Sequence, residues 1–173
     1  MKKILLAAAG ASVLLCAASS MPLQLSGIAG VYKTQHHINV VMGTGEPDED
    51  VAVEDILEIV PTDSSHAYLR THLVFENGHI CGVWGIATLE DGALVYRPHD
   101  NVEGPCTLRL TQEGSQIVFH DADGACKIDY CGARGTLDGP AFPLSARRPI
   151  RYMKRLLASP QYSQATAEQD AHK

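Results

Sequence analysis

Cysteines are the residues of this chain whose type and spacing offer the most chemistry. The segment HDADGACKIDYCGARGTLDG places Cys126 and Cys131 five positions apart. Zinc knuckles place cysteines two to four residues apart and require a second matched pair, and a redox pair has the spacing C-x-x-C. Neither pattern occurs in the sequence. We therefore interpret these thiols as members of disulfide bonds and not as metal ligands.

The start of the chain supports this interpretation because it is typical of a secretory signal. Lys2 and Lys3 precede an apolar run and then small residues, which predicts a signal peptide over residues 1–20 and a periplasmic or secreted protein. Lipoprotein signals place a small residue before the cysteine, and Leu15 before Cys16 argues against lipid anchoring. Four of the five cysteines remain after cleavage, an even number that predicts two bridges in an oxidising compartment.

The pairing of these four cysteines has three solutions, and their number and spacing alone do not choose among them. If the KIDY segment between Cys126 and Cys131 is a strand, their α-carbons lie about 16 Å apart, beyond the ~7 Å that a disulfide can span. A hairpin predicted over residues 106–126 brings Cys106 close to Cys126. By elimination, Cys81 then pairs with Cys131.

Histidines and carboxylates give weaker signals for a site. His36 and His37 are adjacent, so on a strand they point to opposite faces and do not share one ion. An acidic run lacks the ligand order of an EF-hand loop, so we expect a solvated loop, with a rim for a cationic partner or for calcium as the alternative. The run comprises Glu46, Asp48, Glu49, Asp50, Glu54 and Asp55.

No motif for catalysis or metal binding stands out in the rest of the sequence. Asp121 and Asp123 precede Gly124 in a pattern that fits a hairpin turn better than a calcium loop. A triad can be assembled on paper, for example from His72, Asp100 and Ser115, but no G-x-S-x-G or comparable context surrounds the serine. We therefore predict no catalytic residue, no metal and no cofactor.

The net charge indicates which partners are disfavoured, and the chain length indicates the number of domains. The formal net charge of −6 becomes −8 when the predicted signal removes Lys2 and Lys3 and leaves 12 basic against 20 acidic residues. This balance disfavours nucleic acid, because phosphates select basic surfaces. The remaining length suits one domain, which we predict over residues 21–157, followed by a disordered tail over residues 158–173.

Short β-type segments separated by turn signals predict an all-β, mainly antiparallel fold. Segments such as DILEIV and TLRL alternate apolar and polar residues, and Asn77-Gly78 and Asp91-Gly92 are favoured hairpin turns. About eight strands at this spacing predict a small up-and-down barrel or a sandwich. After the strands, a short helix is expected from near Pro149, with Ile150, Met153 and Leu157 on one face.

A Gly-x-aromatic opening on the first strand, Gly30-Val31-Tyr32, and the arginine pair Arg147-Arg148 near a final helix resemble a small calycin or lipocalin-type barrel. The aromatic residue of the first strand is usually Trp in that family and is Tyr32 here. The resemblance implies a ligand cup or a protein-binding rim and does not imply a reaction.

Three residues are candidates for ligand binding. Tyr32 belongs to the motif of the first strand, and Trp84 could line a modest cavity. Arg134 lies in a glycine-rich segment where its guanidinium could hold a carboxylate of a ligand or partner, or pair internally with Asp129 or Asp138.

These features together predict an exported, non-enzymatic binding protein that engages a small ligand through a barrel cup or loop rim. One alternative is an inhibitor or immunity-type protein that docks on a cationic enzyme of the cell envelope. Another is an envelope hydrolase or metal enzyme. Membrane contact is expected only through the basic C-terminal helix, whose cations could attract anionic lipid. These cations are Arg147, Arg148, Arg151, Lys154 and Arg155.

Overall fold

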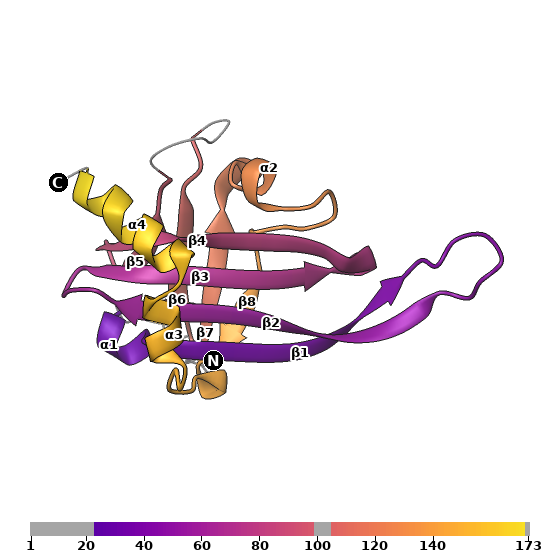
Figure 1. Ribbon diagram of the computed structural model, residues 1–173, viewed down its shortest axis with the longest axis horizontal. Coiled ribbons are helices and arrows are strands. Elements are labelled where there is room, and N and C mark those ends of the chain that lie inside the picture. Colours follow the sequence, from indigo (N-terminus) through magenta and orange to yellow (C-terminus); the bar gives the residue numbers. More distant parts are fainter. Residues whose placement is uncertain (1–22, 99–104, 172–173) are drawn as a thin grey trace, which may run out of the picture.

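The computed structural model describes residues 23–98 and 105–171, so the predicted signal peptide with Cys16, and also Asp100, lie outside the described residues. Within these ranges eight antiparallel strands form one sheet in which each strand pairs with the next along the chain. The strands are β1 (Gly30–Val40), β2 (Glu49–Pro61), β3 (His66–Phe75), β4 (His79–Glu90), β5 (Ala93–Tyr96), β6 (Leu108–Glu113), β7 (Gln116–Asp121) and β8 (Ala141–Pro143). The sheet curls into a nearly closed up-and-down barrel (Figure 1), which confirms the predicted fold class.

The seam of the barrel lies beside β1. The backbone of Val31 exchanges two hydrogen bonds with that of Arg148, at N···O distances of 2.9 and 2.8 Å. The glycine at position 30 is required here, because a β-carbon on Gly30 would lie 2.7 Å from the carbonyl oxygen of Arg148. The Gly30-Val31-Tyr32 motif and the arginine pair therefore meet in space.

Both hairpin turns expected from the sequence are present. Asn77 and Gly78 connect β3 to β4 with φ values of 63° and 68°, and Asp91 and Gly92 connect β4 to β5 with φ values of 48° and 74°. Positive φ at both central residues matches the right-handed twist of the flanking strands. Asn, Asp and Gly tolerate this conformation, which explains why the turns could be placed from the sequence.

Large apolar side chains fill the interior of the barrel. Tyr32, Leu57, Leu69, Phe119 and Phe142 are fully buried there. The hydroxyl of Tyr32 donates to the carbonyl oxygen of Ile28 at 2.7 Å, and its ring packs edge-on against Phe142. Because the centre is packed, the pockets described below lie at the mouth of the barrel and on its outer face.

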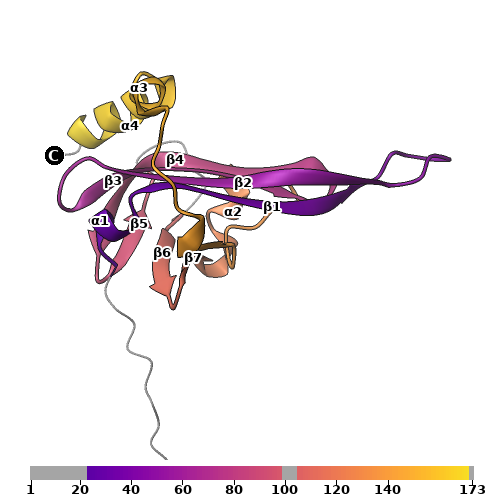
Figure 2. The same cartoon turned by 90° about the horizontal axis from the view of Figure 1, so that it is seen from below.

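Two helices that follow the strands cover part of the outer face of the sheet. Helices α3 (Met153–Leu157) and α4 (Pro160–Ala171) lie across β2, β3 and β4 on the side opposite to β5–β7 (Figure 2). Ile150 and Met153 pack on this face as predicted, but the third apolar contact comes from the buried Leu156, because Leu157 is 43% exposed. Among the described residues, no helix has the length and apolar character needed to cross a membrane.

The tail expected to be disordered forms α4, and that part of the prediction is wrong. The ring of Tyr162 packs edge-on against Tyr68 on β3 at a centroid distance of 5.1 Å, and Ala165 is buried against the sheet. The segment is polar, with few apolar residues to give a helical pattern, so the sequence did not reveal this contact.

The KIDY segment is also not a strand. It forms helix α2 (Lys127–Tyr130). At the start of this helix, the carboxylate of Asp121 accepts the backbone N–H groups of Cys126 at 2.8 Å and Lys127 at 3.0 Å. Both predicted disulfides, Cys106–Cys126 and Cys81–Cys131, are nevertheless confirmed. The pairing was correct, but the extended geometry used to exclude a Cys126–Cys131 bond was wrong.

The remaining elements are short. They comprise α1 (Leu25–Ile28) and the 3₁₀ turns η1 (Glu76–Gly78), η2 (Ala122–Gly124) and η3 (Leu144–Ala146). The η2 turn lies where the sequence predicted a hairpin turn at Asp123 and Gly124. It leads into α2 because Asp121 caps that helix.

A two-stranded ribbon projects from the barrel. The pairing of β2 with β3 ends at Ile56 and His72, so residues 49–55 pair with β1 alone. The ribbon and the connecting loop over residues 41–48 extend well beyond the other strands (Figures 1 and 2).

Candidate functional site

The outer face of β2, β3 and β4 is only partly covered by α3 and α4, and a pocket opens beside the covered part. Its volume is about 420 Å³, within the range usual for small-molecule sites. We call it the outer pocket. Its lining residues are Ile56, Glu58, Arg70, Thr71, His72, Gly82 and Trp84.

The strand register builds the outer pocket from two neighbouring rows of residues. In one row, Glu58 lies opposite Arg70, and Arg70 lies opposite Trp84. In the other row, Ile56 lies opposite His72, and His72 lies opposite Gly82. All these residues point away from the barrel core because their neighbours Leu57, Thr71 and Val83 are buried on the inner face.

A buried ion pair fixes the first row. Glu58 is 0% exposed, and both of its oxygens accept from Arg70, with Nη2 donating to Oε1 at 2.9 Å and Nε donating to Oε2. The hydroxyl of Tyr152, which precedes α3, also donates to Oε1. A buried carboxylate is costly unless it is paired and hydrogen-bonded, and here three donors compensate it.

The pKa values of the two residues that donate to Glu58, Arg70 and Tyr152, are both raised, so both residues keep their protons. Burial opposes the charge of Arg70, but the hydrogen bonds and charge of Glu58 outweigh it and raise the pKa of the guanidinium. Burial, followed by the hydrogen bond to Glu58, raises the pKa of Tyr152 to about 12. The hydroxyl and the guanidinium therefore both remain donors throughout the neutral pH range.

One donor of this cluster remains available to a ligand. Within the part of the chain that the structure describes, Arg70 uses Nε and Nη2 on Glu58, and no contact engages Nη1. The Arg70 side chain is 35% exposed, and Trp84 beside it is half-buried. The outer pocket therefore combines a donor in a fixed position with an aromatic wall.

The three residues predicted to bind a ligand do not come together. Trp84 lines the outer pocket, whereas Tyr32 is a core residue whose hydroxyl is already used. Arg134 is exposed in the connection between α2 and β8 and does not line the outer pocket.

Sequence reasoning missed Glu58, Arg70 and Tyr152. The signal available for Glu58 and Arg70 was a charged residue inside a short apolar stretch, ILEIV in β2 and AYLR in β3. Which charges face each other depends on the strand register, and the sequence did not give that register.

A second pocket lies at the mouth of the barrel, with a volume of about 370 Å³, where β2 separates from β3. Asp55 accepts the backbone N–H of Val74 at 2.7 Å, and Nε2 of His36 lies 3.0 Å from the carbonyl oxygen of Val74. Burial raises the pKa of Asp55 despite these contacts and the nearby histidines. The two side chains satisfy backbone groups that the departing strand leaves unpaired, so we assign them a structural role.

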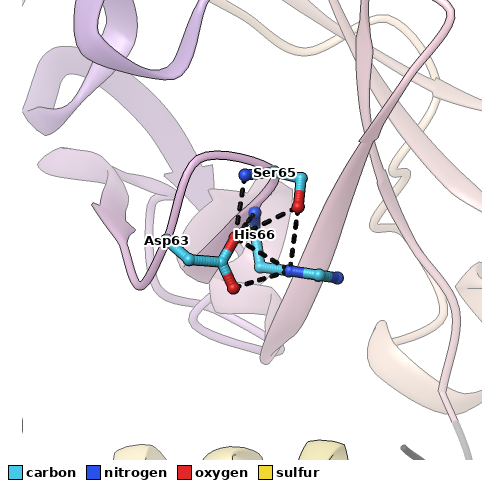
Figure 3. A network of polar contacts seen from close by, with 3 residues as sticks. All are labelled: Asp63, Ser65 and His66. Atoms are coloured by element: carbon cyan, nitrogen blue, oxygen red, sulfur yellow. Dashed lines mark hydrogen bonds and ion pairs between the residues drawn. The ribbon is translucent and has the colours of Figure 1, made fainter.

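The turn between β2 and β3 contains a serine, a histidine and an aspartate in contact (Figure 3). Nδ1 of His66 lies 2.8 Å from the Asp63 carboxylate and 3.2 Å from the Ser65 hydroxyl. In a hydrolytic triad the acid and the nucleophile contact opposite ring nitrogens, whereas here both meet the same one. Hydrogen bonds from the Ser65 backbone and from His66 lower the pKa of Asp63, as expected for a carboxylate that caps a turn.

The predicted acidic loop and histidines belong to the ribbon. His37 pairs with Asp50 at 3.0 Å, while His36 points to the opposite face, as expected from their adjacency. Glu46, Asp48 and Glu49 are exposed. Across residues 23–98 and 105–171, no group of three or more potential ligand side chains is arranged for a metal ion.

Comparison with known proteins adds no assignment. No protein-family model, no curated protein and no solved structure matches the chain. A functional proposal for this protein therefore depends on the contacts in the pockets and on the ribbon.

Proposed function

We propose that this chain is an exported binding protein that holds a small ligand in the outer pocket and does not transform it. The proposal is carried by one observation: Arg70, whose guanidinium is held by the fully buried Glu58, lines the pocket beside Trp84, and no contact among the described residues engages its Nη1. A site of this kind positions its polar group before the ligand arrives, which lowers the entropic cost of binding. The two disulfides support export to an oxidising compartment.

The packed interior leads us to place the ligand on the outer face rather than in a central cup. The outer pocket has an apolar side formed by Ile56 and Trp84 and few polar groups, a balance typical of small-molecule sites. Gly82 leaves part of its floor without a side chain, so a ligand can lie directly on the strand.

Filling the outer pocket should abolish ligand binding without unfolding the protein. A β-carbon on Gly82 would meet only the Thr71 carbonyl oxygen at 3.9 Å, an ordinary contact, so Gly82→Leu places a side chain in the pocket without backbone strain. We expect native mass spectrometry of wild-type protein, purified from the exported fraction without refolding, to show a bound small molecule. The Gly82→Leu variant should lack it.

The matched control is Ile80→Leu, which changes an exposed residue on the same face of β4 outside the pocket lining. This control should retain the ligand. A bound molecule that persists in Gly82→Leu, or wild-type protein without any bound molecule, contradicts the proposed function.

The ribbon favours a second candidate function, that of an inhibitor or immunity-type protein that binds a cationic envelope enzyme. Its tip exposes Val41 and Met42 to 54% and 51%, next to exposed carboxylates. An apolar tip beside single-sign charge suits a partner of opposite charge, which would be steered to it electrostatically. The ribbon projects beyond the other strands (Figure 2), a shape suited to entering a cleft of another protein.

For this candidate, we expect the wild-type protein to retain a basic hydrolase from envelope extract and to inhibit it. The triple variant Glu46→Gln/Asp48→Asn/Glu49→Gln should lose both effects, because it removes three exposed charges without touching the His37–Asp50 pair. Asp91→Asn/Asp123→Asn changes two turn carboxylates outside the ribbon and serves as the control. Equal inhibition by the triple variant and the wild type contradicts this candidate.

A further inference from the structure

We infer that the outer pocket selects a neutral ligand with a flat apolar ring and a carbonyl-type acceptor, in preference to an anion. This inference rests on the proposed function and specifies the chemical class of its ligand. It is carried by the pairing of Glu58 with Arg70, by the free Nη1, and by the two rows of residues that form the floor.

The charge of Arg70 is already compensated. Both oxygens of the buried Glu58 accept from the guanidinium, so the ion pair presents almost no net charge to the pocket. An incoming carboxylate at Nη1 would gain attraction from Arg70 but would also be repelled by Glu58 directly behind it. It would further lose much of its hydration, which an ionised group recovers only in a site with net opposite charge.

Two other charged residues, Arg155 and Glu54, do not alter the net charge that the Glu58–Arg70 pair presents to the pocket. Arg155 lies over the ring of Tyr152 at 5.3 Å, but Arg155 is exposed and its charge is screened by water. On β2, Glu54 is paired with Lys33 at the base of the ribbon. Next to Glu58 the pocket is therefore almost neutral, and it offers the N–H groups of Arg70 that Glu58 leaves unused, with the imidazole of His72 as a second polar group in the lining.

A neutral acceptor meets none of these penalties. A carbonyl oxygen can accept from Nη1 of Arg70 without bringing a second negative charge toward Glu58. The hydrogen bond comes from a charged donor, which makes it stronger than one between two neutral groups.

The floor of the pocket specifies the rest of the ligand. Ile56, His72 and Gly82 form a cross-strand row whose last member has no side chain, and Trp84 stands two residues further along β4. A flat ring can lie over Gly82 against Trp84, where aromatic contact adds stabilisation beyond the burial of area. Its polar substituent then reaches the neighbouring row, in which Arg70 lies.

Benzamide and benzoate provide a matched pair of probes, because they have the same shape and differ in charge. Trp84 is the only tryptophan of the chain, so its indole N–H gives a single signal in an ¹H–¹⁵N spectrum that identifies binding at this pocket. We expect benzamide, titrated to about 20 mM because fragments of few atoms bind weakly, to shift this signal in a saturable manner. Benzoate should bind about tenfold more weakly.

Two variants assign the effect to the pocket. Gly82→Leu should abolish the shift caused by benzamide, and Ile80→Leu should preserve it. Benzoate binding as tightly as benzamide or more tightly overturns the inference, and so does the absence of a Trp84 shift with both probes. The proposed function is judged separately by mass spectrometry, because a bound anion lost in Gly82→Leu would uphold the pocket and reject only the ligand class.

Discussion

Replacing Arg70 with methionine is expected to destabilise the folded protein by about 3 kcal/mol, because among the described residues it leaves the buried Glu58 carboxylate with only the Tyr152 hydroxyl as a partner. The expected loss lies at the lower end for broken buried pairs, since Arg70 is 35% exposed and water can partly take its place. Urea unfolding followed by circular dichroism measures this change in free energy.

The double variant Glu58→Leu/Arg70→Met should recover most of the loss. Replacing both members of a buried ion pair with apolar residues removes the unpaired charge and is often close to neutral. The exposed pair Lys33–Glu54 provides the control, and Lys33→Met should cost less than about 1 kcal/mol. Similar losses for Arg70→Met and Lys33→Met would show that the first row of the outer pocket does not depend on the buried charge of Glu58.

Removing the Cys81–Cys131 bridge by replacing both cysteines with alanine should cost about 4 kcal/mol. This bond joins residues 50 positions apart, and a longer closed loop restricts the unfolded chain more strongly. The Cys106–Cys126 bond closes a separation of 20, so its removal should cost about 3 kcal/mol. Urea unfolding under non-reducing conditions compares the two double variants with the wild type.

The Cys81–Cys131 bond also lies close to the outer pocket, so its removal should affect the order of Trp84 as well as the free energy of unfolding. It connects β4, which carries Gly82 and Trp84, to the segment that follows α2, and Cys81 is fully buried. We therefore expect its removal to broaden the indole signal of Trp84 as well. A loss of less than about 1 kcal/mol would mean that packing alone holds this segment against the barrel.

The strands and their turns could be predicted because their signals are local. Asn77-Gly78 and Asp91-Gly92 fix tight turns whatever lies around them, and the alternation in β6 reflects one buried face. In β2 the residues from Leu57 to Val60 are buried on both faces, because α3 and α4 cover part of the outer side. The KIDY segment was misassigned because its helical conformation depends on Asp121, which caps it from the preceding strand. The three residues of β8 are too few to show any pattern of their own.

The candidate site could not be predicted because its residues come together only in the folded sheet. Glu58 and Arg70 are twelve positions apart, and one step of register would place Arg70 opposite a different residue. Tyr152 lies 94 positions from Glu58, with six strands between them. Trp84 was identified from its residue type alone, which is why it could be named without its partners.

The order of elements along the chain affects how the outer face is completed during folding. All eight strands precede α3 and α4, so the barrel can close while Val60 and Tyr68 still face water. Until Tyr152 packs onto this face, Arg70 is the only donor to Glu58 within the part of the chain that the structure describes. The outer face is thus completed last, and a chain that lacks the helices leaves the apolar side chains of this face exposed to chaperones and proteases.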